Sequence, residues 1–310
     1  MKRIVSFLLS LSFILFSVLF VLFRQPPQKQ AAPPYKGILR LWHIDSFEGG
    51  KGSRANFLKR AASQYEKSHN GVYFMVNTYT AEGAAQAIAQ GDIPDLISFS
   101  CGLNVVGEHC RALSVNFSGG VIGKDCYAYP WCGGGYYLFC LEEDFSLVNA
   151  QNLVISDGGN NLPWVAAALH GLSGEIPTLD STSAYVQFLK GEYRYMLGTQ
   201  RDVCRFQTRG ATVYRQPLQE FNDLFQYIAV TTPDADALTA CMEFTSFLLS
   251  DAVQEKLTEI GMYSAKSISA QNTLSAFVDR GGLEQMRQGS KDALQTGQLK
   301  ILKNYLKPLN

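Results

Sequence analysis

Residues 4–23 form one apolar run that only serines interrupt, and this run restricts where the rest of the chain can fold. Twenty residues at about 1.5 Å per residue span roughly 30 Å, the thickness of the hydrocarbon core of a bilayer. Lys2 and Arg3 precede the run, and positive charges favour the cytoplasmic side. We therefore predict a membrane segment within residues 1–24, a proline-rich tether over residues 25–36, and an extracytoplasmic location for the rest.

An uncleaved anchor and a cleaved signal peptide are both compatible with an apolar segment at this position. The run is longer than the roughly 7–15 apolar residues of a secretory signal. Residues 23–25 offer no small-residue cleavage site, and no cysteine lies near the end of the run. These features favour an anchor. Residues 30–32 (Gln-Ala-Ala) are where cleavage could still occur, in which case the protein would be secreted.

The charge of the outer part argues against a nucleic-acid partner, and its aromatic content is compatible with a ligand-binding cleft. Four of the 27 basic residues precede residue 31 and no acidic residue does, which leaves 23 basic and 27 acidic side chains, a net charge of −4. An acidic domain of this kind does not attract nucleic acid. The chain contains 15 Tyr, 19 Phe and 3 Trp residues, and a sugar- or peptide-binding cleft would draw on such a supply.

Seven cysteines and four histidines give no sign of a metal or cofactor site. The cysteine count is odd, no Cys-x-x-Cys pair occurs, and the histidines lack metal-ligand spacing. We therefore expect no metal and no cofactor. Although an oxidising exterior permits disulfides, we predict mostly free, packed thiols with at most one bridge, for which Cys101–Cys110 and Cys126–Cys132 are close enough in sequence.

Alternating strand and helix patterns after the tether predict an α/β fold. The predicted strands cover residues 38–43, 72–79 and 95–100, and the predicted helices cover residues 53–67 and 81–90. This order indicates a parallel sheet with crossover helices. Because ligands gather at the carboxyl ends of such strands, we expect the loops at 42–54, 78–82 and 100–103 to lie together around a site.

The second part of the chain is less regular. Pro130 and the glycines 133–135 interrupt two extended runs, as in a crossing between two lobes. Residues 150–190 show little pattern. We predict one strand over 192–198, which ends at residues 199–202, and another over 224–230. Two helices should follow, over 238–249 and 252–260, and then a mostly helical tail over 273–306. Asp251 and Gln254 suggest a capping box for the second helix, and Gly261 its end.

Four stretches in order carry a resemblance to a known family: residues 41–50, 91–97, 127–131 and 244–264. The last reads Phe-Thr-Ser-Phe-Leu-Leu-Ser-Asp and continues to Gly-Met-Tyr-Ser. Together they resemble the bacterial extracellular solute-binding protein family 1, the carbohydrate-type receptors of ABC importers. The chain is shorter than is usual in that family, chiefly between residues 145 and 190, and it lacks the family's lipid-anchoring cysteine.

The resemblance implies a type II periplasmic-binding-protein fold with two α/β lobes, a hinge, an interlobe cleft and a shortened second lobe. Lobe 1 would comprise residues 37–129 plus 226–262, and lobe 2 residues 130–225 plus 263–310. The hinge would lie at Tyr129-Pro130, Gln226 and Met262. Such a protein, monomeric in its outer domain, binds a sugar or oligosaccharide, closes, and presents it to ABC permease subunits. It is not an enzyme.

Eight residues are candidates for ligand contacts: His43, Asp45, Glu48, Ser100, Trp131, Trp164, Arg201 and Asp202. Tryptophan rings stack on sugars, and carboxylates, arginine and hydroxyls bind sugar hydroxyl groups. Each also has a structural interpretation. His43 could be a core histidine, Asp45 and Ser100 turn residues, and Glu48 a cap or solvated residue. The tryptophans could be packing residues, and Arg201 with Asp202 a salt-bridged pair.

Two other functional classes deserve comparison. An enzyme is disfavoured because the sequence has no Gly-x-Ser-x-Gly elbow and no motif that marks glycosidase carboxylates. A membrane-tethered ligand sensor, or a degenerate binding scaffold, would keep the same fold. The missing lipid-anchoring cysteine and the short second lobe favour this alternative, and ligand binding would separate it from a transport receptor.

Overall fold

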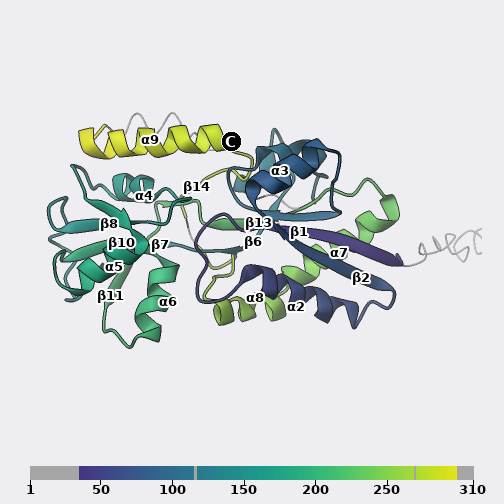
Figure 1. The fold of residues 1–310 in the computed structure, drawn as a ribbon, viewed down its shortest axis with the longest axis horizontal. Coiled ribbons are helices and arrows are strands. Elements are labelled where there is room, and N and C mark those ends of the chain that lie inside the picture. Colours follow the sequence, from purple (N-terminus) through teal and green to yellow (C-terminus); the bar gives the residue numbers. More distant parts are fainter. Residues whose placement is uncertain (1–34, 115–116, 269, 299–310) are drawn as a thin grey trace, which may run out of the picture. The chain divides into compact units, whose positions relative to one another are not determined.

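The computed structural model describes residues 35–114, 117–268 and 270–298, and its strands form two five-stranded sheets (Figure 1). The first sheet has the order β2-β1-β3-β13-β6. Its strands are β1 (Gly37–Ile44), β2 (Val72–Tyr79), β3 (Leu96–Phe99), β13 (Phe225–Val230) and β6 (Tyr129–Gly133). β1 pairs in parallel with β2 and β3, as predicted, whereas β13 runs antiparallel to β3 and β6.

The helices of the first sheet follow from local signals in the sequence. In α2 (Arg54–Glu66), the Ser53 side chain accepts a hydrogen bond from the N–H of Asn56, and the buried face repeats at helical spacing. α3 (Ala81–Ala89) begins after the capping residue Thr80, and Gly91 follows it with a φ of 82°. α7 (Ala235–Leu248) begins after Asp234. We call the first sheet and these helices the first half.

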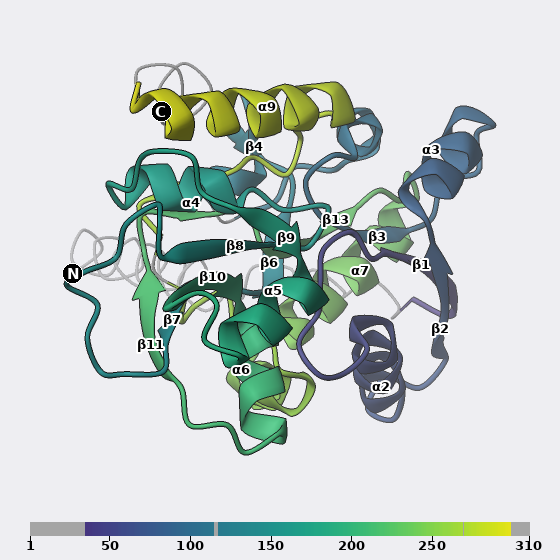
Figure 2. The same ribbon diagram turned by 60° about the vertical axis from the view of Figure 1, so that its left-hand side comes forward.

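The second sheet has the order β11-β7-β10-β8-β9. Its strands are β11 (Tyr214–Leu218), β7 (Tyr136–Cys140), β10 (Tyr195–Thr199), β8 (Leu153–Asp157) and β9 (Thr178–Asp180). α4 (Pro163–Leu169), α5 (Ser181–Leu189), α6 (Gln200–Thr208) and α9 (Arg280–Thr296) accompany it. α4 and α9 lie side by side in both views (Figures 1 and 2). We call the second sheet with α4, α5 and α6 the second half. That these halves correspond to the two moving lobes implied by the family resemblance stays a prediction.

Short elements complete the chain between these larger ones. η1 (Asn104–His109), η2 (Ser118–Gly120), β4 (Val121–Ile122) and β5 (Asp125–Cys126) precede β6. β12 (Phe221–Asn222) pairs in parallel with β14 (Asn272–Thr273). α8 (Asp251–Gln254) continues into the 3₁₀ helix η3 (Glu255–Ile260).

The region of residues 150–190 contains β8, α4, β9 and α5, although its sequence pattern is weak. Pro163 through Ala168 in α4 are all buried, so no polar face marks the helix. The predicted strand ending at residues 199–202 is also corrected, because α6 begins at Gln200. The side chain of Thr199 and that of Asp202 form a capping box there.

The crossing between the two sheets lies at the glycines rather than at Pro130. Gly133 and Tyr263 exchange two backbone hydrogen bonds of 2.9 Å, and the N–H of Gly134 donates to the carbonyl of Leu224 at 2.7 Å. Pro130 lies within β6, contrary to the expectation that it interrupts an extended run. β6 is the outer strand of its sheet, where the missing N–H of proline costs no ladder hydrogen bond.

The start of α8 differs from its prediction. Ser250 is the N-cap and makes no side-chain cap bond, so the predicted capping box of Asp251 and Gln254 is wrong. The Gln254 amide instead donates to the carbonyls of Trp131 and Leu248, at 2.9 Å each. Gly261 ends η3 with a φ of 67°, as predicted.

All seven cysteines lie in the described ranges and are free thiols, which agrees with the prediction of mostly free thiols with at most one bridge. The apolar run at 4–23 and most of the tether lie outside these ranges, as does the end of the predicted tail helix. Among the described residues, no helix combines the length and apolar character needed to cross a bilayer.

Candidate functional site

A cavity of about 440 Å³ opens at the carboxyl ends of β1, β2 and β3. Its lining includes Asp45 and Ser46 after β1, the turn from β2 into α3, and Cys101 with Gly102 after β3. The three loops expected to converge from the strand order therefore meet at one cavity. Residues from later in the chain complete the wall: Asn160, Arg280 and Leu283.

Tyr79 supplies an aromatic ring to this cavity. It is the last residue of β2, and its ring packs on that of Trp42 with the centroids 4.3 Å apart. Trp42 is fully buried, so this contact holds Tyr79 in place. Tyr79 was not among the candidates, although its position at the carboxyl end of a predicted parallel strand was an available signal.

Asp45 is the candidate that lines this cavity, with 48% of its side chain exposed. Arg54, which is buried, donates to the Asp45 carboxylate and to the carbonyl of Phe47. Burial opposes ionisation of Asp45, but hydrogen bonding to His43 and the charge of Arg54 outweigh it and hold the pKa of Asp45 below its ordinary value. The carboxylate is therefore an ionised acceptor at the cavity wall.

His43 and Ser100 lie just behind this wall. His43 is fully buried, its Nδ1 is 3.1 Å from Ser98 Oγ, and its Nε2 is 3.8 Å from Asp45. Burial lowers the pKa of His43, which favours the neutral ring. Ser100 is buried and its hydroxyl bonds to that of Ser46. Both residues therefore support Asp45 and Ser46 and do not reach the cavity themselves.

Glu48 does not line the cavity but connects the two halves. The Ser181 hydroxyl donates to its carboxylate at 3.0 Å, and Arg201 forms an ion pair with the same oxygen. The side-chain amide of Gln200 donates to the Glu48 carbonyl at 3.0 Å. Thus the loop after β1 is bound to the starts of α5 and α6. We call these contacts the Glu48 clasp.

Trp131, Trp164 and Asp202 have structural environments that argue against ligand contact. Trp131 is fully buried, stacks on Phe57 and donates from its indole N–H to Ser98 Oγ at 2.9 Å. Trp164 is 2% exposed and lies under Lys291 Nζ, 4.3 Å from its ring centroid. Asp202 caps α6, and burial raises its pKa. The sequence alone could not show that the indole rings of Trp131 and Trp164 are covered by other side chains.

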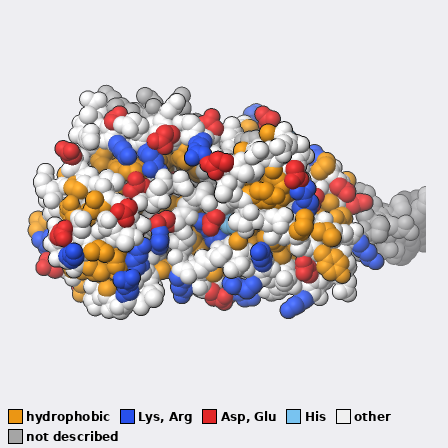
Figure 3. Space-filling view, in the orientation of Figure 1, with side chains coloured by type: hydrophobic (Ala, Val, Ile, Leu, Met, Phe, Trp, Pro, Cys, Tyr) orange, Lys and Arg blue, Asp and Glu red, His pale blue; other side chains and the backbone are white. Residues whose placement is uncertain are grey.

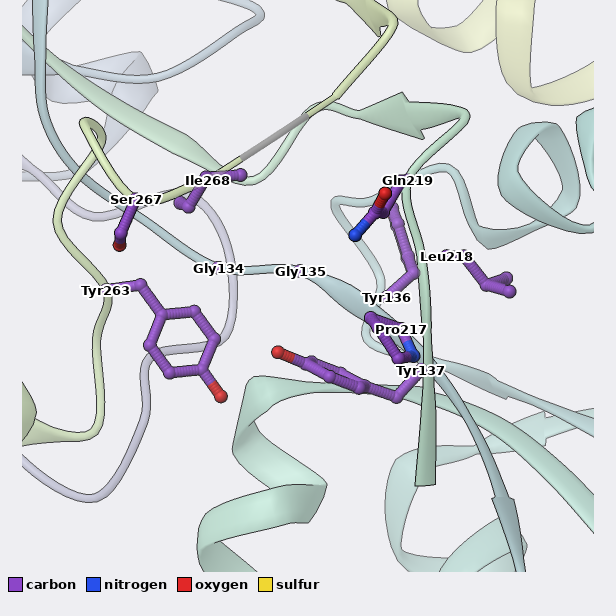
Figure 4. A pocket seen from close by; sticks show the side chains of 10 residues that line it. All are labelled: Gly134, Gly135, Tyr136, Tyr137, Pro217, Leu218, Gln219, Tyr263, Ser267 and Ile268. Carbon is purple, nitrogen blue, oxygen red and sulfur yellow. The ribbon is translucent and has the colours of Figure 1, made fainter.

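A second cavity, of about 250 Å³, lies beside the crossing segments (Figure 4). The side chains of Tyr137 and Tyr263 face each other across it, with Gln219 at its far side. Burial and a hydrogen bond to Tyr137 raise the pKa of Tyr263, so its hydroxyl stays protonated. None of the eight candidate residues lines this cavity.

Comparison of the sequence with family models and with curated proteins finds no match. Solved structures do match. The sugar-binding protein MalE from Xanthomonas citri gives a TM-score of 0.62 at 12% identity, covering 88% of this chain and 97% of that one. The maltodextrin-binding protein MalE1 from L. casei BL23 gives 0.59 at 11%, covering 89% and 99%. A galacto-N-biose/lacto-N-biose I-binding protein from Bifidobacterium longum gives 0.56 at 13%, covering 88% and 99%.

The chain has the type II periplasmic-binding-protein fold. At these identities the likeness establishes the fold, which agrees with the two mixed sheets and their linking segments. The larger of the two cavities described above lies where the strands of the first half end, and Asn160 of the second half reaches its wall. A binding-protein fold was the expectation from the four sequence stretches, and it is confirmed.

Proposed function

We propose that this protein is an extracytoplasmic solute-binding protein of an ABC importer and that it holds a carbohydrate in the 440 Å³ cavity. The observation that carries the proposal is the composition of that cavity. One aromatic ring, Tyr79, lies beside an ionised carboxylate, Asp45, and the polar side chains of Asn160 and Arg280. Sugar recognition needs a ring to stack on the apolar face of a sugar and polar groups to bind its hydroxyls.

The proposed action is binding and delivery, without catalysis. The solute would lie between the two halves, closure would bury it, and the closed form would dock on a permease. The apolar run at residues 4–23 would keep the protein at the outer face of the membrane. The similar structures support this reading, because one is named as a sugar-binding protein and another as the galacto-N-biose/lacto-N-biose I-binding protein of an ABC transporter.

The test is calorimetric titration of the purified full-length chain with a panel of oligosaccharides. The panel includes maltotetraose, lacto-N-biose and mannotriose, which are bound in three of the similar structures. We expect saturable binding of at least one. Tyr79→Ala should weaken it tenfold or more by removing the stacking surface.

Two further variants keep the result interpretable. Asn160→Ala changes an exposed residue of the cavity wall and should weaken binding severalfold while the fold persists. Tyr73→Ala removes a tyrosine of the same strand that is 58% exposed and outside the cavity, and should leave affinity unchanged. Absence of binding across the panel would contradict transport of a sugar and favour the sensor or the degenerate scaffold.

A further inference from the structure

A third cavity, of about 190 Å³, lies between the loop at 50–52 and α6, and its lining is strongly basic. Four of its lining residues are cationic and none is acidic. The lining consists of Gly50, Lys51, Arg201, Cys204, Arg205, Thr208 and Arg209. In Figure 3, Lys and Arg side chains gather in the region of α6. The outer part of the chain is acidic overall, so this concentration of positive charge is local.

Among the described residues, two of the four cations have no acidic partner to balance them. Arg201 forms an ion pair with Glu48, and Arg205 lies 3.3 Å from a carboxylate oxygen of Asp202. Within the described part of the chain, Lys51 and Arg209 lie in no ion pair. Uncompensated like charges around one cavity repel each other, and an anion between them would relieve that repulsion.

Two of the cationic groups, and the backbone of the loop that carries a third, are held in position before any ligand arrives. The guanidinium groups of Arg205 and Arg209 both lie over the ring of Tyr185, at 4.8 and 5.5 Å from its centroid. The Arg205 side chain donates to the carbonyl of Ser181 at 2.8 Å. On the opposite wall, the backbone N–H of Lys51 donates to the carbonyl of Ile260 at 3.0 Å, which fixes that loop.

We propose that this cavity is an anion-binding site for a phosphate or sulfate group, with Lys51 and Arg209 as its main ligands. Arginine suits such groups because its planar fork can donate two parallel hydrogen bonds to their oxygens, and lysine adds a point charge. The site is separate from the sugar cavity, since the two share no lining residue. It therefore neither requires nor excludes sugar binding.

The first experiment titrates the full-length chain with sodium phosphate at constant ionic strength, with sodium chloride as the reference. We expect saturable binding of phosphate. The double variant Lys51→Ala/Arg209→Ala should weaken it at least tenfold. Lys59→Ala/Lys190→Ala removes the same charge from exposed positions outside the cavity and should bind like the unmodified chain. Equal binding in both variants, or no binding beyond chloride, would overturn the proposal.

The second experiment locates the anion without any substitution, which covers the case of a variant that does not fold. Cys204 lines the cavity as a partly exposed free thiol, and Cys110 is a partly exposed thiol outside it. Phosphate should slow alkylation of Cys204 and not of Cys110, measured on peptides by mass spectrometry. Unchanged labelling of Cys204 at saturating phosphate would contradict the site.

A last comparison distinguishes the source of the phosphate group. Glucose 6-phosphate represents a soluble ester and dihexanoyl phosphatidylglycerol a lipid headgroup. Stronger protection of Cys204 by the first identifies a soluble ligand, and stronger protection by the second a membrane ligand. Protection by neither, although free phosphate protects, would overturn an ester as the ligand. Sugar titrations of the same samples show whether the other cavity is intact.

Discussion

At the residue scale, Asp223 is the buried carboxylate with the clearest energetic consequence. Its two oxygens accept hydrogen bonds from the Tyr136 hydroxyl at 2.6 Å and from the backbone N–H of Leu162 at 2.9 Å. Burial raises the pKa of Asp223 from 3.8 to about 6. The folded protein therefore holds this proton more tightly than the unfolded chain does.

The stability of the protein should depend on this group between about pH 4 and pH 6. Because the folded pKa is the higher one, the contribution of Asp223 is fully present below pH 4 and is lost as the pH rises through 6. The free energy of unfolding of the natural chain relative to Asp223→Asn should fall by roughly 3 kcal/mol over that range. Urea denaturation at pH 4, 5, 6 and 7 measures it. Asp236→Asn, at an exposed position, is the control, and a flat difference for Asp223→Asn would contradict the assignment.

The Glu48 clasp gives a second residue-scale prediction. Glu48 is 18% and Arg201 36% exposed, so their ion pair is only partly screened by water. A double-mutant cycle of Glu48→Gln and Arg201→Gln should show a coupling of about 1 kcal/mol in the free energy of unfolding. The exposed pair Arg60–Glu259, with 3.8 Å between its atoms, should couple by less than about 0.3 kcal/mol. Equal couplings would mean that the clasp is an ordinary surface contact.

At the scale of elements, Arg287 supplies polar contacts that join α9 to the second half, beside its buried Met286, Ala293 and Leu294. The Arg287 side chain is 13% exposed, lies 3.6 Å from an Asp157 oxygen, and donates to the carbonyls of Gly159 and Asn161. Its guanidinium also covers Trp164. At the start of the helix, Arg280 pairs with Glu82 of α3, but both side chains are largely exposed.

Truncation of these two arginines should therefore have different effects. Arg287→Ala removes the donor to two backbone carbonyls and the ion-pair partner of Asp157, and should lower the free energy of unfolding by about 2 kcal/mol. Arg280→Ala removes a surface pair and should cost less than about 0.5 kcal/mol. Chemical denaturation of both variants tests the difference. A larger loss for Arg280→Ala would show that α9 is held chiefly from the first half.

Whether a helix or strand could be predicted from the sequence depends on whether it has a polar face or turn residues that mark its ends. β2 was predicted with its observed bounds because turn residues flank it. Pro163 suggested the start of α4, but the extent of this helix was not predicted because it is buried on all sides and has no polar face. α6 was missed although Thr199-x-x-Asp202 is a capping signature. Its first residues read equally well as a polar loop after a strand.

At the scale of the whole molecule, Gly134, which lies between the two sheets, leaves room for a side chain that joins the two halves, that of Gln200. A Cβ on Gly134 would lie 2.1 Å from Oε1 of Gln200, the residue that holds the Glu48 carbonyl. A Cβ on Gly135 would meet nothing closer than 3.6 Å. Neither glycine has a positive φ, so space and not backbone conformation distinguishes them.

Gly134→Ala should therefore displace Gln200 and break its hydrogen bond to Glu48, at a cost of about 1 kcal/mol. Faster amide hydrogen exchange in the loop at 45–52 and at the start of α6 should accompany that loss. Gly135→Ala should change neither quantity beyond error. If both variants behave alike, contact between the halves does not depend on Gln200.

The sequence alone determined the parallel strands of the first half, the loops that converge on the main cavity, and that most of the cysteines are free thiols. These follow from periodicity, strand order and spacing, which are local properties of the chain. Only the tertiary structure decided which side chains reach that cavity. Asp45 lines it, whereas Glu48 and Arg201 bind each other and Trp131 lies in the core. The physical reason is that exposure depends on residues distant in the sequence, such as Phe57 against Trp131, and no local pattern encodes those contacts.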